Sequence, residues 1–284
     1  MSILVPVDAT PQSLQAVKFA LAFTNGNNEL SLLHVIPPFL SRFAVNQLGN
    51  KTVQEFQLDE AKEDLKEIVE LVEQAKVPYK LNIQFGEPHE AIVEAAREGH
   101  TAVVMGTHGY GRMTGYLMQS VSYPTIHDVE IPVFLVPEAA KINDKWKTVL
   151  IAVDGSDHAM KAAQQAIRMG KEDGTRFVLL TAVIPPVAYA GVYGIGWEDT
   201  ATLESWGKQT IRPYEELFEQ AQVPYESKVL IGDPATLIKE VAQETEADVI
   251  VLGHHGMSGI AGTLMGSVTF KVIYRTKTPL LVVK

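Results

Sequence analysis

The chain has 284 residues, no cysteine and a formal net charge of −10 at pH 7, and both halves of the sequence are acidic. Its length allows two domains of ordinary size, and the lack of cysteine excludes disulfides, thiol catalysis and cysteine metal sites. A nucleic-acid partner is not expected, because it needs a clustered basic face, whereas backbone N–H groups alone can bind a small anion.

The N-terminal residues 1–8 contain no basic segment and end at an acid, so we expect no secretory signal and predict a cytoplasmic protein. Two uncharged stretches, 177–197 and 249–270, are long enough for a membrane span. Pro185 and Pro186 break the first, and glycines with two histidines break the second, so no contact with a membrane is expected.

The first half contains an apolar run that ends in an acid, at residues 3–8, and a second apolar run at 101–105. A glycine pair, Gly106 and Gly109, follows the second run, and Gln119 with Ser120 comes nine residues later. Glycine permits positive φ and close backbone approach, so such a loop can gather N–H groups around an anion. In this half, a third glycine is missing from the loop.

An internal repeat relates the two halves at a separation of 146 to 148 residues. Matched segments include 3–8 with 149–154, 86–88 with 232–234, and 131–136 with 278–283. The matches run through the whole of each half and predict two copies of one domain, 1–142 and 143–284. The segment that connects the two copies, near residues 140–147, lacks the composition of a flexible linker, so the two copies are expected to pack together.

The second half alternates between short apolar runs and segments of helical periodicity. Strands are predicted at 148–153, 177–183, 226–231, 248–252 and 280–283, and helices at 157–169, 203–222, 235–244 and 267–276. Ser156, Asp233 and Gly266 stand at the helix starts. This order predicts an α/β fold in each half, a doubly wound five-stranded parallel sheet with helices on both faces and a ligand crevice at the carboxyl ends of the strands.

Asp154 ends the first strand of the second half, where the first and fourth strands of such a sheet lie side by side. A carboxylate there can accept hydrogen bonds from ribose hydroxyls or hold a cation that bridges phosphates. The structural alternative is a helix N-cap, but Ser156 fits the cap better. Asp8 occupies the matching place in the first half.

Three glycines follow the buried strand 248–252, namely Gly253, Gly256 and Gly266. Their spacing predicts a phosphate-binding loop, against the alternative of two ordinary turns. The next residues, Ser267 to Thr269, open the following helix, so their hydroxyl and N–H groups could contact phosphate or cap the helix.

His254 and His255 lie within this loop, and His255 could point toward phosphate. No metal site is expected, because adjacent residues rarely share one ion and no third ligand is suitably spaced. The sequence has neither a Gly-x4-Gly-Lys-Ser/Thr motif nor Gly-x-Gly-x-x-Gly after the first strand. A P-loop NTPase and a dinucleotide oxidoreductase are therefore not expected, and no catalytic base is visible.

Asp154 with Gly155-Ser156 and the pattern Gly-x2-Gly-x9-Gly-Ser, which ends at Ser267, resemble the universal stress protein family in its tandem form. The resemblance covers essentially the whole chain. It implies a site for ATP or a related adenine nucleotide, with or without Mg²⁺, and a base that contacts the backbone at Val153 and Val183. It also implies pairing through the last strand, either between the two halves or in a homodimer.

The resemblance implies a cofactor site of ten residues in the second half, which are Val153, Asp154, Val183, Gly253, His255, Gly256, Gly266, Ser267, Val268 and Thr269. In the first half, Gln119 replaces the third glycine, and its side chain would crowd a phosphate or force a different backbone angle. The leading hypothesis is an ATP-binding stress-response protein that is regulatory rather than catalytic, since no base or arginine is placed to activate water. The alternatives are an interaction scaffold that binds no nucleotide and a slow ATPase.

Overall fold

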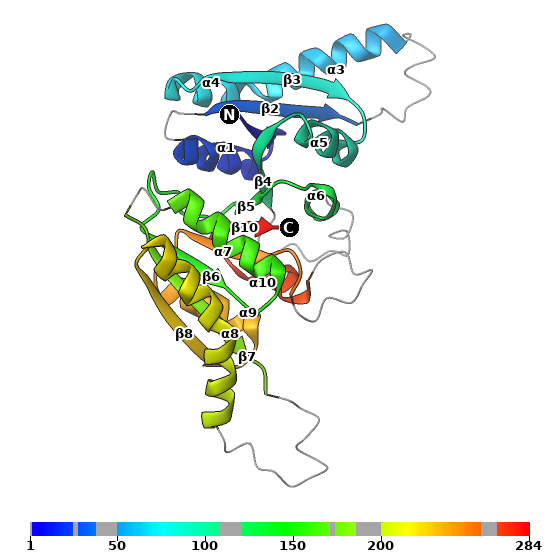
Figure 1. The fold of residues 1–284 in the computed structure, drawn as a ribbon. Helices are drawn as coiled ribbons and strands as arrows, with labels where there is room; N and C mark the ends of the chain where they lie inside the picture. Colours follow the sequence, from blue (N-terminus) through cyan, green and yellow to red (C-terminus); the bar gives the residue numbers. More distant parts are fainter. Residues whose placement is uncertain are drawn as a thin grey trace, which may run out of the picture. The chain divides into compact units, whose positions relative to one another are not determined.

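The computed structural model describes residues 2–24, 28–37, 50–107, 121–170, 174–185, 200–256 and 266–284. They form two compact units, Met1–Asp144 and Lys145–Lys284. Each unit has the predicted α/β architecture, with a parallel sheet between two helical layers (Figure 1). Within the described ranges, no helix is long and apolar enough to cross a membrane.

The sheet of the N-terminal unit has the strand order β3-β2-β1-β4-β5, and all the strand pairs are parallel. Helix α1 packs on β4 and β5 and against α4, whereas α5 and α6 pack against each other on the strands. The elements are β1 (Ser2–Pro6), α1 (Pro11–Thr24), β2 (Glu29–Ile36), α3 (Asn50–Asp64), α4 (Lys66–Ala75), β3 (Tyr79–Phe85), α5 (Pro88–Ala96), β4 (His100–Thr107), α6 (Ser122–Asp128) and β5 (Val133–Pro137).

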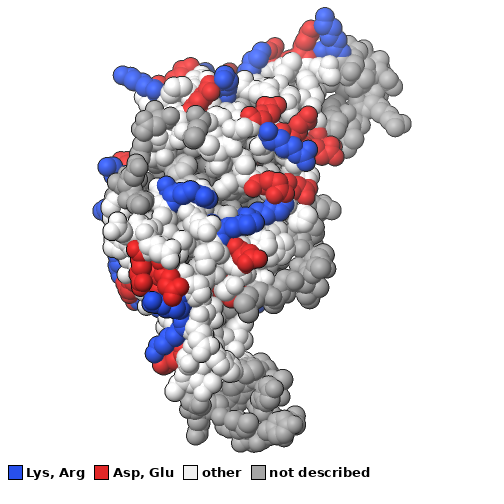
Figure 2. Space-filling view, viewed as in Figure 1, with Lys and Arg blue, Asp and Glu red and all other residues white. Residues whose placement is uncertain are grey.

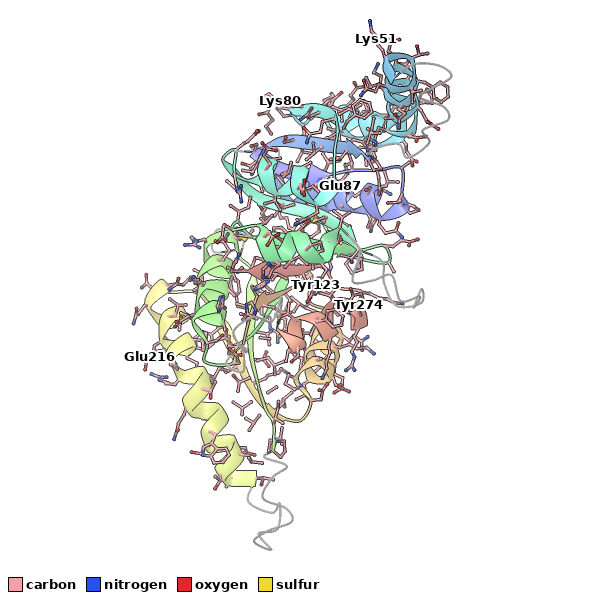
Figure 3. All side chains as sticks on the ribbon, turned by 90° about the vertical axis from the view of Figure 1, so that its right-hand side faces the viewer. Lys51, Lys80, Glu87, Tyr123, Glu216 and Tyr274 are labelled. Carbon is pink, nitrogen blue, oxygen red and sulfur yellow. The ribbon has the colours of Figure 1, made fainter. Side chains whose placement is uncertain are left out.

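The C-terminal unit repeats this arrangement with the order β10-β9-β6-β7-β8. Helices α7 and α8 form one layer and α9 with α10 the other, and Glu216 on α8 and Tyr274 on α10 mark the two layers in Figure 3. The elements are β6 (Thr148–Ala152), α7 (Asp157–Gly170), β7 (Arg176–Val183), α8 (Thr200–Ala221), β8 (Tyr225–Ile231), α9 (Pro234–Glu244), β9 (Val249–Gly253), α10 (Ser267–Arg275) and β10 (Leu280–Val283).

The central strands carry the core, as their continuous apolar runs predict. In β6 and β9 only the terminal residues, Ala152 and Gly253, are half-buried. Both faces of these strands are covered by helices, which explains why their sequence does not alternate between apolar and polar residues. Helix α8 begins three residues before the predicted start at 203, because its first turn is exposed and gives no apolar periodicity.

The first and fourth strands of the C-terminal unit pair as predicted. Ile151 of β6 lies opposite Val251 of β9 in a parallel register. The carboxyl ends of both strands therefore reach the same edge of the sheet. This edge holds the residues that sequence analysis assigned to a ligand site.

Helix α8 rests on β7 and β8 through Gly207, which is buried and has no side chain to keep the elements apart. A Cβ at this position would lie 2.2 Å from Cγ1 of Val229 and 2.9 Å from Cγ2 of Val183. The contact sets the distance between the helix and the strands.

Gly207→Ala is expected to destabilise the C-terminal unit by about 1–3 kcal/mol through overpacking, although alanine normally favours a helix by about 1 kcal/mol. Urea unfolding can be followed by fluorescence, because all three tryptophans lie in the sequence of this unit. Ser205→Ala, at an exposed position of the same helix, is the control and should change stability by less than about 0.5 kcal/mol. A Gly207→Ala protein as stable as the wild type would contradict the packing argument.

Candidate functional site

The end of β9 approaches the first turn of α7 so closely that only glycine fits at Gly253. A Cβ there would lie 2.8 Å from the carbonyl carbon of His158 and 2.9 Å from the backbone nitrogen of Ala159. A larger residue would push the strand and the helix apart. The contact keeps the loop after β9 beside a helix N-terminus, where N–H groups and the helix dipole favour an anion.

Asp154 and Gly256 meet at this edge of the sheet. A Cβ on Gly256 would lie 2.3 Å from Oδ2 of Asp154, so the absence of a side chain makes room for the carboxylate. Its other oxygen, Oδ1, accepts a hydrogen bond of 3.0 Å from the backbone N–H of Ser156. The structure thus brings together two residues that were assigned to one site from positions about one hundred residues apart.

Ser156 caps helix α7, as the sequence predicts. Its Oγ accepts a hydrogen bond of 3.2 Å from the N–H of Ala159 and donates to the carbonyl of His255 at 3.4 Å. The second bond connects the start of α7 to the loop after β9. The cap is therefore supplied by the serine, and Asp154 orients the turn in front of it.

Gly266 is the N-cap residue of α10, and its N–H donates to the carbonyl of His254 at 3.0 Å. Its φ of −59° and ψ of 137° are open to any residue, so the idea that a side chain would force a different backbone angle fails at this position. A Cβ would lie 3.2 Å from that same carbonyl oxygen and 3.5 Å from the nitrogen of Gly256. Crowding is the physical reason for glycine here.

The first turn of α10 contains Ser267, Val268 and Thr269, which are exposed, half-buried and buried respectively. The Thr269 hydroxyl donates to the carbonyl of Gly253 at 3.0 Å and so connects α10 to β9. The hydroxyl proton of Thr269 is therefore used inside the protein. Of the two hydroxyls that were expected to donate to phosphate, the one on Ser267 remains the candidate. Gly266 provides no side-chain cap for the N–H groups of this turn.

Val153 and Val183 are the residues at which the resemblance implies contacts to a base. Both already use backbone groups in hydrogen bonds within the protein. The N–H of Val153 donates to the carbonyl of Leu180 at 2.9 Å, and its carbonyl accepts from the Thr181 hydroxyl at 2.8 Å. The carbonyl of Val183 accepts from the N–H of Gly232 at 3.0 Å. Each carbonyl oxygen has a second lone pair, so a ligand can still donate a hydrogen bond to either carbonyl.

Sequence reasoning missed Tyr214 of α8, which is only 1% exposed. Its hydroxyl accepts a hydrogen bond of 3.1 Å from the N–H of Gly155 and donates to the carbonyl of Ser156 at 3.4 Å. Burial raises the pKa of Tyr214 to about 12, so the phenol is neutral near pH 7. The repeat gives no signal for this residue, because Ile68 is its match in the first half.

Three histidines gather beside Asp154. His254 and His255 join through their Nδ1 atoms at 2.6 Å, and the ring of His158 lies 5.6 Å from that of His255 between centroids. Sequence reasoning considered the adjacent pair but missed His158, which comes from the start of α7. Within the described part of the chain, no group of three or more His, Asp or Glu side chains has the geometry to hold a metal ion.

The N-terminal unit has the same backbone constraint but a different carboxylate environment. A Cβ on Gly106 would lie 2.4 Å from the carbonyl oxygen of Gln12. Asp8 is held in its own turn, since its Oδ1 accepts from the Thr10 N–H at 3.1 Å and from the Ser13 hydroxyl at 2.6 Å. Three residues of the matching loop in this unit, Gly109, Gln119 and Ser120, lie outside the described ranges.

Comparisons of the sequence with a family model and with known proteins indicate the same family. The model of the universal stress protein family matches residues 1–137 and 145–284. A universal stress protein of Mycolicibacterium smegmatis is 26% identical over 298 residues, which cover 99% of this chain and 96% of that protein. Universal stress protein MJ0531 of Methanocaldococcus jannaschii is 33% identical over 142 residues, which cover 49% of this chain and 82% of that protein.

Among solved structures, a universal stress protein from Archaeoglobus fulgidus has a TM-score of 0.75 to this chain. The match covers 100% of this chain and 98% of that one, at 22% sequence identity. At this level of identity, the likeness shows that the two proteins share a fold across the full length.

Tyr214→Phe is expected to lower the free energy of unfolding by about 1 kcal/mol near pH 7, because the Gly155 N–H loses its acceptor. The pKa of Tyr214 is about 12 in the folded chain against the ordinary 10.0. Tyrosine therefore stabilises the fold fully below pH 10 and progressively less as the pH rises through 12. Urea unfolding at several pH values should show this alkaline loss in the wild type and in Tyr274→Phe, and a smaller loss in Tyr214→Phe, which keeps only the contributions of Tyr79 and Tyr225, whose pKa values are also raised.

Proposed function

Because the chain belongs to the universal stress protein family, with one family domain in each half, we propose that it is an ATP-binding stress-response protein. The proposal places the nucleotide in the C-terminal unit and assigns it a regulatory role. The observation that carries it is the 2.3 Å separation between the Cβ position of Gly256 and Oδ2 of Asp154. A carboxylate and a glycine loop share one edge of the sheet, so close together that no side chain fits at Gly256.

The phosphates are assigned to the loop after β9 and the start of α10. Backbone N–H groups at Gly256 and in the first turn, Ser267 to Thr269, provide donors without needing a lysine. The Ser267 hydroxyl is exposed and adds a further donor. On the face seen in Figure 2, basic and acidic side chains are interspersed, which favours a small anionic ligand over a nucleic acid.

The ribose and the base are assigned to the carboxyl ends of β6 and β7. Asp154 accepts from the ribose hydroxyls, and its Oδ1 also accepts from the N–H of Ser156. The amino group of adenine donates to the carbonyl of Val153 or Val183, because the Val153 N–H is already used. Mg²⁺ is proposed as an optional companion of ATP.

A regulatory role is proposed because, within the described residues, the charged groups that act on His158 at the start of α7 include no arginine. Those that act on His158 are Asp154, Asp157, Lys161 and His255. An aspartate that holds a ribose is not placed to activate water, so hydrolysis is expected to be slow at most. The pairing of the two halves within the chain, with a homodimer as the alternative, stays a prediction.

Asp154→Asn and Gly266→Gln are each expected to weaken ATP binding by tenfold or more. The first removes the ribose acceptor and the second crowds the loop at a backbone angle that glutamine tolerates, so the fold should persist. Calorimetric titration of the intact protein, with and without Mg²⁺, measures the effect. Asp8→Asn is the matched control in the N-terminal unit and should bind as the wild type does. Equal affinity in all four proteins would refute the proposed site.

Phosphate release from excess ATP tests the regulatory role. The wild-type protein is expected to release phosphate no faster than Asp154→Asn, and to yield intact ATP when it is denatured after incubation. Continuous release over many turnovers that disappears in Asp154→Asn would instead identify the protein as an ATPase.

A further inference from the structure

The histidine cluster faces the same edge of the C-terminal sheet as the proposed phosphate loop. His158 belongs to the first turn of α7, while His254 and His255 follow β9. The rings of His254 and His255 have centroids 4.2 Å apart, and those of His158 and His255 are 5.6 Å apart. His254 is 1% exposed, whereas the other two are half-buried and so accessible to a ligand.

The hydrogen bond between the two Nδ1 atoms limits how many charges the pair can hold. One Nδ1 must donate and the other must accept, and the accepting ring is then neutral. While this bond persists, His254 and His255 together carry at most one positive charge. Among the three histidines, further positive charge at this edge must come from His158.

Burial, more than the neighbouring charges, favours the neutral form of His158. Burial lowers the pKa of His158, the neighbouring His255 and Lys161 lower it further, and Asp157 and Asp154 oppose this effect. The titratable groups that the elements packed against α7 carry near this edge include Asp154 after β6, Tyr214 on α8, His254 and His255 after β9, and Lys284 after β10. A phosphate placed among these groups would favour the charged imidazole.

The N-terminal unit lacks this chemistry at the matching position. Gln12 stands in place of His158, and its amide donates to Glu138 at 2.5 Å. Thr107 stands in place of His254. Glutamine is therefore compatible with this backbone position at the start of the helix, and it cannot take up a proton.

Building on the proposed function, we propose that His158 contacts the phosphates of the bound nucleotide together with His255, and that the site takes up a proton when the phosphates bind. The acidic groups at this edge repel an anion, and a protonated imidazole offsets them. Binding then strengthens as the pH falls, by up to tenfold per pH unit for one linked proton. The dependence levels off once His158 is already protonated in the ligand-free protein.

Calorimetric titration of the intact protein with ATP, in two buffers of different protonation enthalpy between pH 6 and 8, counts the protons taken up. His158→Gln is expected to take up fewer protons than the wild type and to show a flatter dependence of affinity on pH. His158→Lys carries a permanent charge and should also show the flatter dependence. His89→Gln, which changes a histidine of α5 in the N-terminal unit, is the control and should match the wild type.

The protonation of ATP itself contributes equally to every variant, so the difference between proteins isolates His158. Adenosine, which has no phosphate, should bind without proton uptake. Equal proton uptake in the wild type, His158→Gln and His158→Lys would overturn the inference while leaving the nucleotide site intact, as would equal uptake with adenosine. Lack of ATP binding to the wild type at every pH would overturn the proposed function and the inference together.

Discussion

The close approach of the loop after β9 to the start of α7 is the constraint on which the candidate site depends. It requires that Gly253 and Gly256 have no Cβ, because the space is occupied by the backbone of α7 in one case and by Asp154 in the other. The parallel pairing of β6 with β9 brings the carboxyl ends of both strands to this edge. The carboxylate, the helix N-terminus and the glycine loop are neighbours because of that pairing, although they are distant in sequence.

The duplication separates what the fold needs from what the site needs. Gly106 meets the carbonyl of Gln12 as Gly253 meets α7, so both units keep the backbone contact. The side chains around it differ. Asp8 is bound by the Ser13 hydroxyl, whereas Ala159 stands in that place in the C-terminal unit and cannot bind Asp154 in the same way. The two units thus share the same close backbone contact. In the N-terminal unit the aspartate binds within its own turn, whereas in the C-terminal unit it lies against a glycine loop.

The sequence predicted the sheet, the helix caps and the meeting of Asp154 with the glycine loop, because all three follow from local patterns and from the topology of a doubly wound sheet. It did not predict Tyr214 or His158. Tyr214 reaches the site from a helix in the middle of the unit, where apolar periodicity explains its burial equally well. His158 looks like an exposed residue in the first turn of a helix until the end of β9 is placed beside it. The hydroxyl of Thr269 was also assigned to a ligand, and only the tertiary contact with Gly253 shows that it is used internally.

An acidic protein that binds an anion must offset charge at the point of binding. The carboxylates of Asp154 and Asp157 lie at the same edge as the loop, and both act on His158. Backbone N–H groups bring only partial charges, so a phosphate close to these acids needs an added cation or an added proton. Mg²⁺ would supply the first without involving the histidines, whereas His158 and His255 would supply the second. Protonation of His158 depends on pH, whereas binding of Mg²⁺ depends on the Mg²⁺ concentration. The two ways of offsetting the charge would therefore make nucleotide occupancy depend on different conditions in the cell.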